Sequence, residues 1–209
     1  MSDSLAVDLF VEDLAHEVFV GALVDRIARE EDVALSLQAR SARGGHPRAL
    51  EEFGTYQVLV EKGALTKRTP DLVVVVIDGN CATPRKKREE IRRVTRPALL
   101  DRVVTGCPNP HVERWFLADP DSFHNVVGYQ PVVGPEKCER EHYKRILADA
   151  VRRGQQPATL SGIEFAAELV EAMNLYRAGR RDSSLRAFVG DLRGRFREIR
   201  RREGVGGAQ

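Results

Sequence analysis

The chain of 209 residues lacks any apolar run long enough to cross a bilayer, and charged residues make up 31% of it. Its first residues, MSDSLAVDLF, also lack the basic start, apolar centre and small-residue cleavage site of a signal peptide. We therefore expect a cytoplasmic protein with no membrane association. A chain of this length can bury a sizeable core without help from disulfides or a structural metal.

Motifs of several common enzyme classes are missing as well. The sequence contains no G-x-S-x-G elbow, and its five histidines show no H-E-x-x-H spacing. It also has no Gly-rich loop ending in GKS or GKT, so any ATPase would be a separate subunit. Covalent hydrolase chemistry therefore has no support, and metal-assisted phosphodiester chemistry is the favoured enzyme class.

Cysteine is scarce. Cys81, Cys107 and Cys138 stand far apart and form no C-x-x-C pair of the kind that binds zinc or carries redox chemistry. We expect all three to be free thiols. The neighbouring residues His16 and Glu17 are interpreted as a surface or capping pair and not as part of a metal site.

What the sequence does contain is an alternation of short apolar segments with helical patterns. The expected strands cover residues 5–11, 33–39, 71–78 and 102–105. The expected helices follow Asp13 and Pro84 and cover residues 50–61, 112–118, 139–152, 161–176 and 185–202. The run LVVVV within the third strand is typical of a parallel strand covered on both faces. The sequence thus predicts an α/β fold with a short parallel sheet flanked by helices.

Three stretches of chain are expected. Residues 1–135 form the α/β core, and residues 136–203 form a helical C-terminal extension packed on the same domain. Residues 204–209, which are rich in glycine, are expected to be a disordered tail.

Acidic residues follow two of the apolar strands directly. Glu12 and Asp13 follow the first strand, and Asp78 ends the third. Ligands of open α/β sheets bind beyond the carboxyl ends of the strands, and carboxylates there would suit Mg²⁺ or Mn²⁺. Glu113, in the segment CPNPHVERW, offers a further carboxylate with His111 two residues before it. The alternative, equally open, is that these acids only form turns and cap helices.

Four motifs point to a family. The segments LFVEDLAHE, DLVVVVIDGN, CPNPHVERWFLAD and DSSLRAFVGDLR together resemble the Toprim-like bacterial proteins of domain-of-unknown-function family 4276. The resemblance implies a Toprim fold, shared with overcoming-lysogenization-defect nucleases, in which a Glu and an Asp-x-Asp bind magnesium. Glu12 matches the Glu, and Asp78 matches the first Asp. Asn80 stands where the second Asp belongs, and Glu113 would supply the missing charge.

The resemblance implies a magnesium-dependent or manganese-dependent nuclease, or a nuclease subunit, with catalytic residues Glu12, Asp78 and Glu113. The expected metal ligands are Glu12, Asp13, Asp78, Asn80 and Glu113. It also implies a separate ABC-type ATPase as partner, in bacterial antiviral defence. The alternative, favoured by Asn80, is a non-catalytic, degenerate Toprim module that docks such an ATPase or senses nucleic acid.

A basic segment begins seven residues after Asp78. It would place cations beside a metal-bound phosphodiester, and its members are Arg85, Lys86, Lys87, Arg88, Arg92 and Arg93. The alternative is a solvated helix face on which Glu89 and Glu90 pair with neighbouring bases. A second arginine-rich stretch, residues 193–202, is expected to be an ordinary helix end, because cations suit the negative end of the helix dipole.

Overall fold

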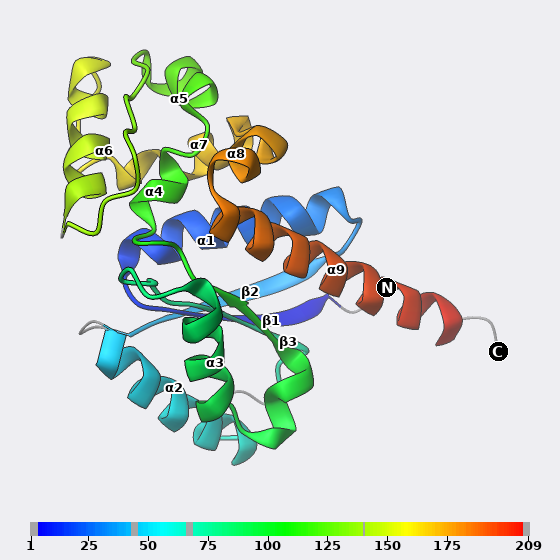
Figure 1. Cartoon of the computed structure of the whole chain (residues 1–209). Coiled ribbons are helices and arrows are strands. Elements are labelled where there is room, and N and C mark those ends of the chain that lie inside the picture. The colour runs from blue at the N-terminus through cyan, green and yellow to red at the C-terminus, as the bar shows by residue number, and fades with distance from the viewer. Residues whose placement is uncertain (1–3, 43–45, 66–68, 140, 207–209) are drawn as a thin grey trace.

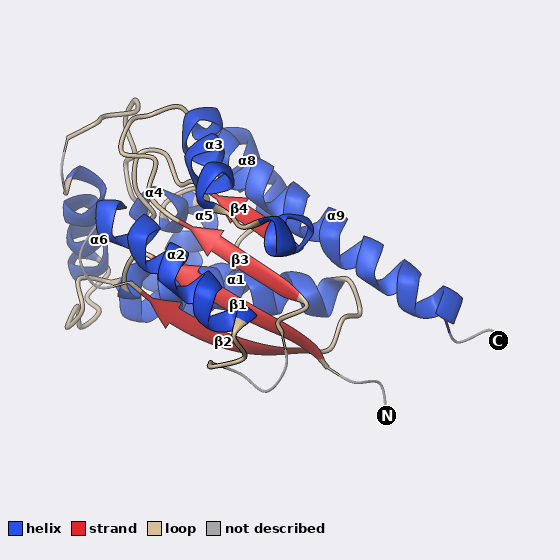
Figure 2. Cartoon of the chain, turned by 90° about the horizontal axis from the view of Figure 1, so that it is seen from below, coloured by secondary structure: helices blue, strands red, loops and turns tan. Residues whose placement is uncertain are grey.

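The computed structural model describes residues 4–42, 46–65, 69–139 and 141–206. Its centre is a sheet of four parallel strands in the order β2-β1-β3-β4 (Figure 2). The strands are β1 (Leu5–Val11), β2 (Leu35–Ser41), β3 (Leu72–Val76) and β4 (Val103–Gly106). The α/β class expected from the sequence, a short parallel sheet flanked by helices with further helices at the C-terminal end, is confirmed.

Most helices lie close to their expected positions, and the exception is a helix over residues 120–127 that the sequence does not predict. They are α1 (Leu14–Glu30), α2 (His46–Glu61), α3 (Pro84–Val94), α4 (Glu113–Phe116), α5 (Pro120–Val127), α6 (His142–Arg153), α7 (Ala166–Ala172), α8 (Leu175–Arg181) and α9 (Ser183–Gly206). Two short 3₁₀ helices, η1 (Pro97–Arg102) and η2 (Ile163–Phe165), precede β4 and α7. Asp13 and Thr83 cap α1 and α3, each accepting a backbone N–H with its side chain. In the part of the chain described, no helix combines the length and apolarity needed to cross a membrane.

Two expectations about the C-terminal helices were wrong. The single helix expected over residues 161–176 is broken between α7 and α8, because Asn174 leaves the helical path. Its side chain caps α8 through the N–H of Arg177, and its own N–H donates to buried Asp119. The tail expected from residue 204 is helical as far as Gly206, and residues 207–209 lie outside the described part.

The sheet separates two hydrophobic cores. Alternate strand residues such as Leu9 and Val74 pack with α1 and α9, while Phe10 and Val75 pack with α2 and α3. Figure 1 shows α1 and α9 on one face of the sheet and α2 and α3 on the other, with α4 to α8 in a further layer beyond α1. Both faces of β3 are therefore covered, as its continuous valine run predicts.

The C-terminal helices share the larger core. Apolar residues of α6 to α9 belong to the same cluster as β1 and α1, so residues 136–203 do not form a separate globule. The approach of α9 to the sheet depends on Gly106, where a Cβ would lie 2.9 Å from Val76 Cγ2 and 3.0 Å from Phe188 Cδ2. A side chain at that position would push α9 away from β4.

The strand order places a crevice between β1 and β3. From β1 the chain passes through α1 to β2 on one side, and then through α2, on the opposite face, to β3 on the other side of β1. The connections therefore diverge from the carboxyl ends of β1 and β3, which is where open α/β sheets bind ligands. Glu12 follows β1, and Asp78 lies two residues beyond β3.

One charged residue lies inside the sheet. Asp8 of β1 is 4% exposed, and its Oδ2 accepts hydrogen bonds from the Tyr56 hydroxyl at 2.7 Å and from Arg40 Nε at 3.1 Å. A buried carboxylate needs such partners, because desolvation without them is costly. The three residues tie β1 to β2 and α2.

Replacement of Tyr56 by Phe should leave Asp8 one hydrogen bond short. We expect Tyr56→Phe to lower the free energy of unfolding by about 1–3 kcal/mol in urea titrations. Tyr176→Phe, at a position that is 76% exposed, is the control and should change stability by less than about 0.5 kcal/mol. Equal effects of the two substitutions would show that the Asp8 network contributes nothing to stability.

Candidate metal centre

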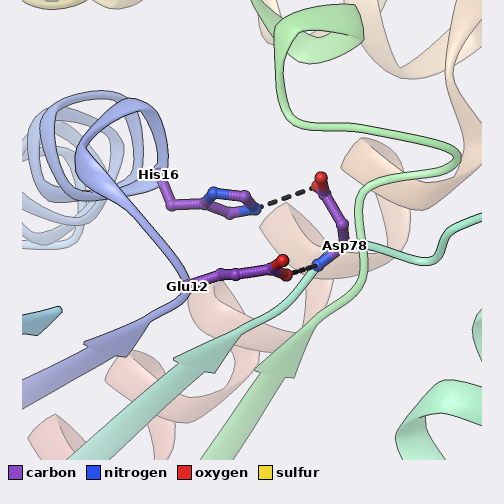
Figure 3. Close-up of side chains that lie close together, drawn as sticks. All are labelled: Glu12, His16 and Asp78. Carbon is purple, nitrogen blue, oxygen red and sulfur yellow. Dashed lines mark hydrogen bonds and ion pairs between the residues drawn. The ribbon is translucent and has the colours of Figure 1, made fainter. Parts of the chain in front are cut away.

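Three side chains converge at the crevice between β1 and β3. Glu12, His16 and Asp78 each offer one ligand atom, and these atoms all lie within 4.8 Å of one another. Glu12 follows β1, His16 lies in the first turn of α1, and Asp78 follows β3, as Figure 3 shows. The two carboxylates expected at strand ends are therefore brought together by the parallel pairing of β1 with β3.

Asp78 is the most heavily bonded member of this group. It is 9% exposed, and its Oδ1 accepts the Val112 N–H at 2.9 Å and lies 3.0 Å from His16 Nε2. Its Oδ2 lies 3.0 Å from His111 Nδ1. Burial alone would raise the pKa of Asp78, but the charge of His16 and the hydrogen bond from His111 hold it below its usual value.

His16 lies between two carboxylates and is fully buried. Its Nδ1 is 2.7 Å from Asp13 Oδ1, and its Nε2 faces Asp78. Burial lowers the pKa of His16, but the charge of Asp78 and the hydrogen bonds to Asp13 and Asp78 outweigh burial and raise it well above 6.5. Both ring nitrogens face carboxylate oxygens, so each can donate a hydrogen bond while no ion is bound, and a metal ion at Nε2 would displace the proton there.

The expectation that His16 belongs to a surface or capping pair was wrong. Its backbone N–H does donate to the capping residue Asp13, but its ring points across the strand ends toward Asp78. A sequence signal was available, because His16 follows Glu12 by four residues at the start of a helix. That spacing places a helical side chain back over the preceding turn, and therefore over the strand end.

Two loops beyond the sheet hold Asp78 in place. Gly79 N donates to Pro108 O at 2.7 Å, and Asn80 N donates to Pro110 O at 3.0 Å, so the loop after β3 lies against the loop after β4. A Cβ on Gly79 would lie only 2.9 Å from Pro108 O, so the close approach needs glycine. This contact places the backbone N–H of Val112 beside the Asp78 carboxylate.

Glu12 and Asp78 line a cleft of about 430 Å³, while His16 lies buried behind them. The cleft is lined by Glu12, Asp13, Asp78, Asn80, Cys81, His111, Glu113, Cys138, Glu141 and Lys144. All five residues expected as metal ligands therefore face one cavity. They are not equally close, because Asp13 and Glu113 lie outside the described group of acidic and histidine ligands whose atoms fall within 4.8 Å.

Electrostatics in the cleft favour a cation. Burial, and next the charge of Asp78, raise the pKa of both Glu12 and Glu113, so these carboxylates repel one another when all are ionised. A divalent cation would relieve that repulsion.

The donor set also fits a metal. Carboxylate oxygens suit Mg²⁺ and Mn²⁺, and an imidazole extends the choice to other transition metals. The contact of Asp13 with His16 Nδ1 matches the way carboxylates orient metal-binding histidines.

The basic segment lies mainly on α3, and its residues differ in availability. Lys87 is 8% exposed and pairs with Glu90 at 2.9 Å. Three others meet acids: Arg88 meets Asp191 at 3.0 Å, and Arg92 and Arg93 meet Glu89 at 3.9 Å and 3.4 Å. Arg85 and Lys86 are exposed. The same helix thus carries cations that pair with acids and cations that are exposed to solvent. Contact of this segment with nucleic acid stays a prediction.

The expectation of three free thiols holds for Cys107 alone. Cys81 and Cys138 form a disulfide at the rim of the cleft, across a sequence separation of 57 residues. No sequence pattern indicates the bond, because the loop contacts that bring the two residues together depend on the whole fold. Cys107 is buried against α2 and α3, and burial raises the pKa of its thiol to about 12.

The close contact at Gly79 predicts a selective effect of an added methyl group. Gly79→Ala should force the two loops apart, lower the free energy of unfolding by about 1–3 kcal/mol and weaken divalent metal binding. Gly54→Ala is the matched control, since a Cβ there meets nothing within 4 Å on helix α2. It should raise stability by about 0.5–1 kcal/mol and leave metal binding unchanged. Urea unfolding and calorimetry provide both readouts, and unchanged metal binding by Gly79→Ala would contradict the role of the loop contact.

The disulfide predicts a definite thiol count. Protein purified without reductant should present almost no reactive thiol when folded, because Cys107 is buried with a raised pKa. Unfolding without reductant should expose one thiol per chain, and unfolding after reduction should expose all three cysteines. Three thiols in the unfolded, unreduced protein would contradict the disulfide, as measured with a chromogenic thiol reagent.

No protein-family model, curated protein or solved structure matches this chain, so its function has to be argued from the site itself.

Proposed function

We propose that this chain is a divalent-metal-dependent, Toprim-like nuclease or a nuclease subunit. One observation carries the proposal. Carboxylates from the ends of β1 and β3 meet a buried histidine within 4.8 Å, in the crevice where an open parallel sheet binds ligands. The resemblance of the same two strand ends to the Toprim acids agrees with this proposal.

Each residue of the cleft has a proposed role. Glu12 and Asp78 hold Mg²⁺ or Mn²⁺, with Glu113 as a further carboxylate and Asn80 as a neutral oxygen donor at the rim. Asp13 orients His16 through Nδ1 and leaves Nε2 directed at the ligand group. When bound, the ion would supply a Lewis acid that polarises the phosphodiester and lowers the pKa of water.

His111 is placed to handle a proton. Its Nδ1 is held by Asp78 Oδ2, and the ring lines the cleft with 18% of the side chain exposed. The hydrogen bond to Asp78 raises the pKa of His111 above its ordinary value. A histidine fixed through one nitrogen can give or take a proton at the other, so His111 would protonate a leaving oxygen or deprotonate a water.

The proposed setting follows from the family resemblance. The protein would act in the cytoplasm with a separate ABC-type ATPase, in antiviral defence, and cut nucleic acid. Two exposed cations support nucleic acid as the substrate. Arg85 and Lys86 lie in the first turn of α3, a few residues beyond Asp78, and could contact backbone phosphates.

A second candidate function is a non-catalytic module that docks the ATPase or senses nucleic acid. Two observations favour it. The hydrogen bonds of Asp78 and His16 are satisfied by protein groups alone, so the network is stable in principle without an ion. Asn80 also removes one of the negative charges that Toprim nucleases use.

Metal binding decides between the two functions. We expect wild-type protein to bind Mn²⁺ or Mg²⁺ in calorimetry, and Glu12→Gln to weaken binding at least about tenfold, because it removes one carboxylate ligand. Glu168→Gln, at an exposed position on α7, is the matched control and should bind as wild type does. Circular dichroism checks that each variant is folded.

Cleavage of labelled oligonucleotides completes the test. Wild-type protein, with its partner ATPase where cleavage requires one, should cut in Mn²⁺ and stop in EDTA, and Glu12→Gln should not cut. Metal-dependent cleavage by Glu12→Gln would overturn the assigned site. A folded wild type that binds no divalent ion would overturn the nuclease and favour the docking module.

A further inference from the structure

A second hollow lies between α3 and the start of α9, beyond the β4 edge of the sheet. Its volume is about 390 Å³, and it is lined by Pro84, Arg85, Arg88, Glu89, Arg92, Ser183, Ser184 and Ala187. None of these residues lines the metal cleft. We call this hollow the arginine pocket.

Three arginines of α3 give the pocket its charge. Arg85, Arg88 and Arg92 are spaced three and four residues apart, so they share one face of the helix. Glu89 is the only acid among the lining residues, and it also lies within ion-pair distance of Arg93 outside the pocket. The pocket therefore has an excess of positive charge.

The arginines are incompletely neutralised. Arg85 is exposed and has no acid within 4.0 Å in the described chain. Arg88 uses one terminal nitrogen on Asp191 at 3.0 Å, while its Nε is buried without an acceptor among the described residues. A buried donor without a partner is uncommon and costly, and a bound oxyanion would supply acceptors beside it.

The arginines of α9 provide an internal comparison. Arg193 and Arg197 meet Glu30 and Glu31 at the end of α1, at 2.5 Å and 2.7 Å, and Arg200 meets Asp32 at 3.2 Å. These ion pairs join α9 to the end of α1. Among the described residues the arginine pocket faces fewer acids, because only Asp191 and Glu89 pair with Arg88 and Arg92, and Arg85 and the Nε of Arg88 are left for a ligand.

The N-terminus of α9 adds nothing to anion binding. Asp182 precedes it, and its Oδ1 already accepts the Leu185 N–H at 2.9 Å. The attraction for anions therefore rests on the guanidinium groups alone. Guanidinium groups bind phosphate with two parallel hydrogen bonds, which makes phosphate the best match for this pocket.

The arginine pocket and the metal cleft adjoin the same loop. Ser184 lines the pocket, and its Oγ accepts the Asn109 N–H at 3.3 Å and the Trp115 Nε1–H at 2.9 Å. Two residues after Asn109, His111 lines the metal cleft. A chain of phosphates that crosses this loop would reach both hollows.

We propose that the arginine pocket binds a backbone phosphate of a nucleic-acid strand whose scissile phosphodiester lies in the metal cleft. The inference rests on the proposed nuclease function, and it assigns the positioning of the strand to Arg85, Arg88 and Arg92. Phosphate contacts of this kind fix the register of the strand and carry no sequence preference.

The test measures nucleic-acid binding without metal. A fluorescein-labelled oligonucleotide is titrated in EDTA, with wild type, with Arg85→Gln/Arg92→Gln and with the matched control Arg180→Gln/Arg181→Gln, which removes two exposed charges from α8. We expect the pocket variant to bind at least about tenfold more weakly, with the slope of log affinity against log salt reduced by about one. The control should change affinity less than about threefold.

Competition identifies the source of the phosphate. Inorganic phosphate and a mononucleotide should displace the labelled strand far less well than an unlabelled oligonucleotide. Displacement of the labelled strand by inorganic phosphate at the same concentration as the oligonucleotide would overturn the backbone assignment. An equal loss of oligonucleotide affinity in the pocket variant and in the α8 control would overturn it too.

Two further variants keep the outcome clear. Arg85→Gln alone removes an exposed side chain without an acid partner, so it should fold normally and still weaken binding. Glu168→Gln, at an exposed position on α7, should bind the oligonucleotide as wild type does, and EDTA keeps the metal site out of the measurement. Failure of the metal site would therefore leave this result unchanged. If Arg85→Gln and the double variant bind the oligonucleotide as tightly as wild type does, the arginine pocket alone is overturned.

Discussion

The arrangement of the cleft depends on a single buried carboxylate. Asp78 accepts hydrogen bonds from the ring of His16 on α1, from the ring of His111 and from the backbone of Val112. These partners come from two separate segments, α1 and the loop after β4, and all of them meet at the same carboxylate. A carboxylate with so many donors is costly to protonate or remove, so it fixes the relative positions of β1, β3 and the loop after β4.

Much of the fold follows from local sequence rules. The valine run of β3, the Asp13 cap of α1 and the Pro84 start of α3 each specify an element without long-range information. The acids at the ends of β1 and β3 were identified for the same reason, since parallel strands share one carboxyl edge.

Features that depend on contacts between distant segments could not be predicted from the sequence. The burial of His16 depends on the loops that cover the sheet end, and the Cys81–Cys138 bond depends on where the chain returns after α5. The break at Asn174 depends on the buried acid Asp119, which lies 55 residues earlier in the chain. In each case a long-range partner overrides a sound local preference.

The disulfide also bears on the unfolded chain. It closes a covalent ring with a sequence separation of 57 residues, which contains β4 and the loop that carries His111. Closing a ring of that size lowers the conformational entropy of the unfolded state, and chain-entropy arguments give a stabilisation of about 4 kcal/mol. The redox potential of its surroundings therefore becomes a determinant of how firmly this protein stays folded, quite apart from any ligand.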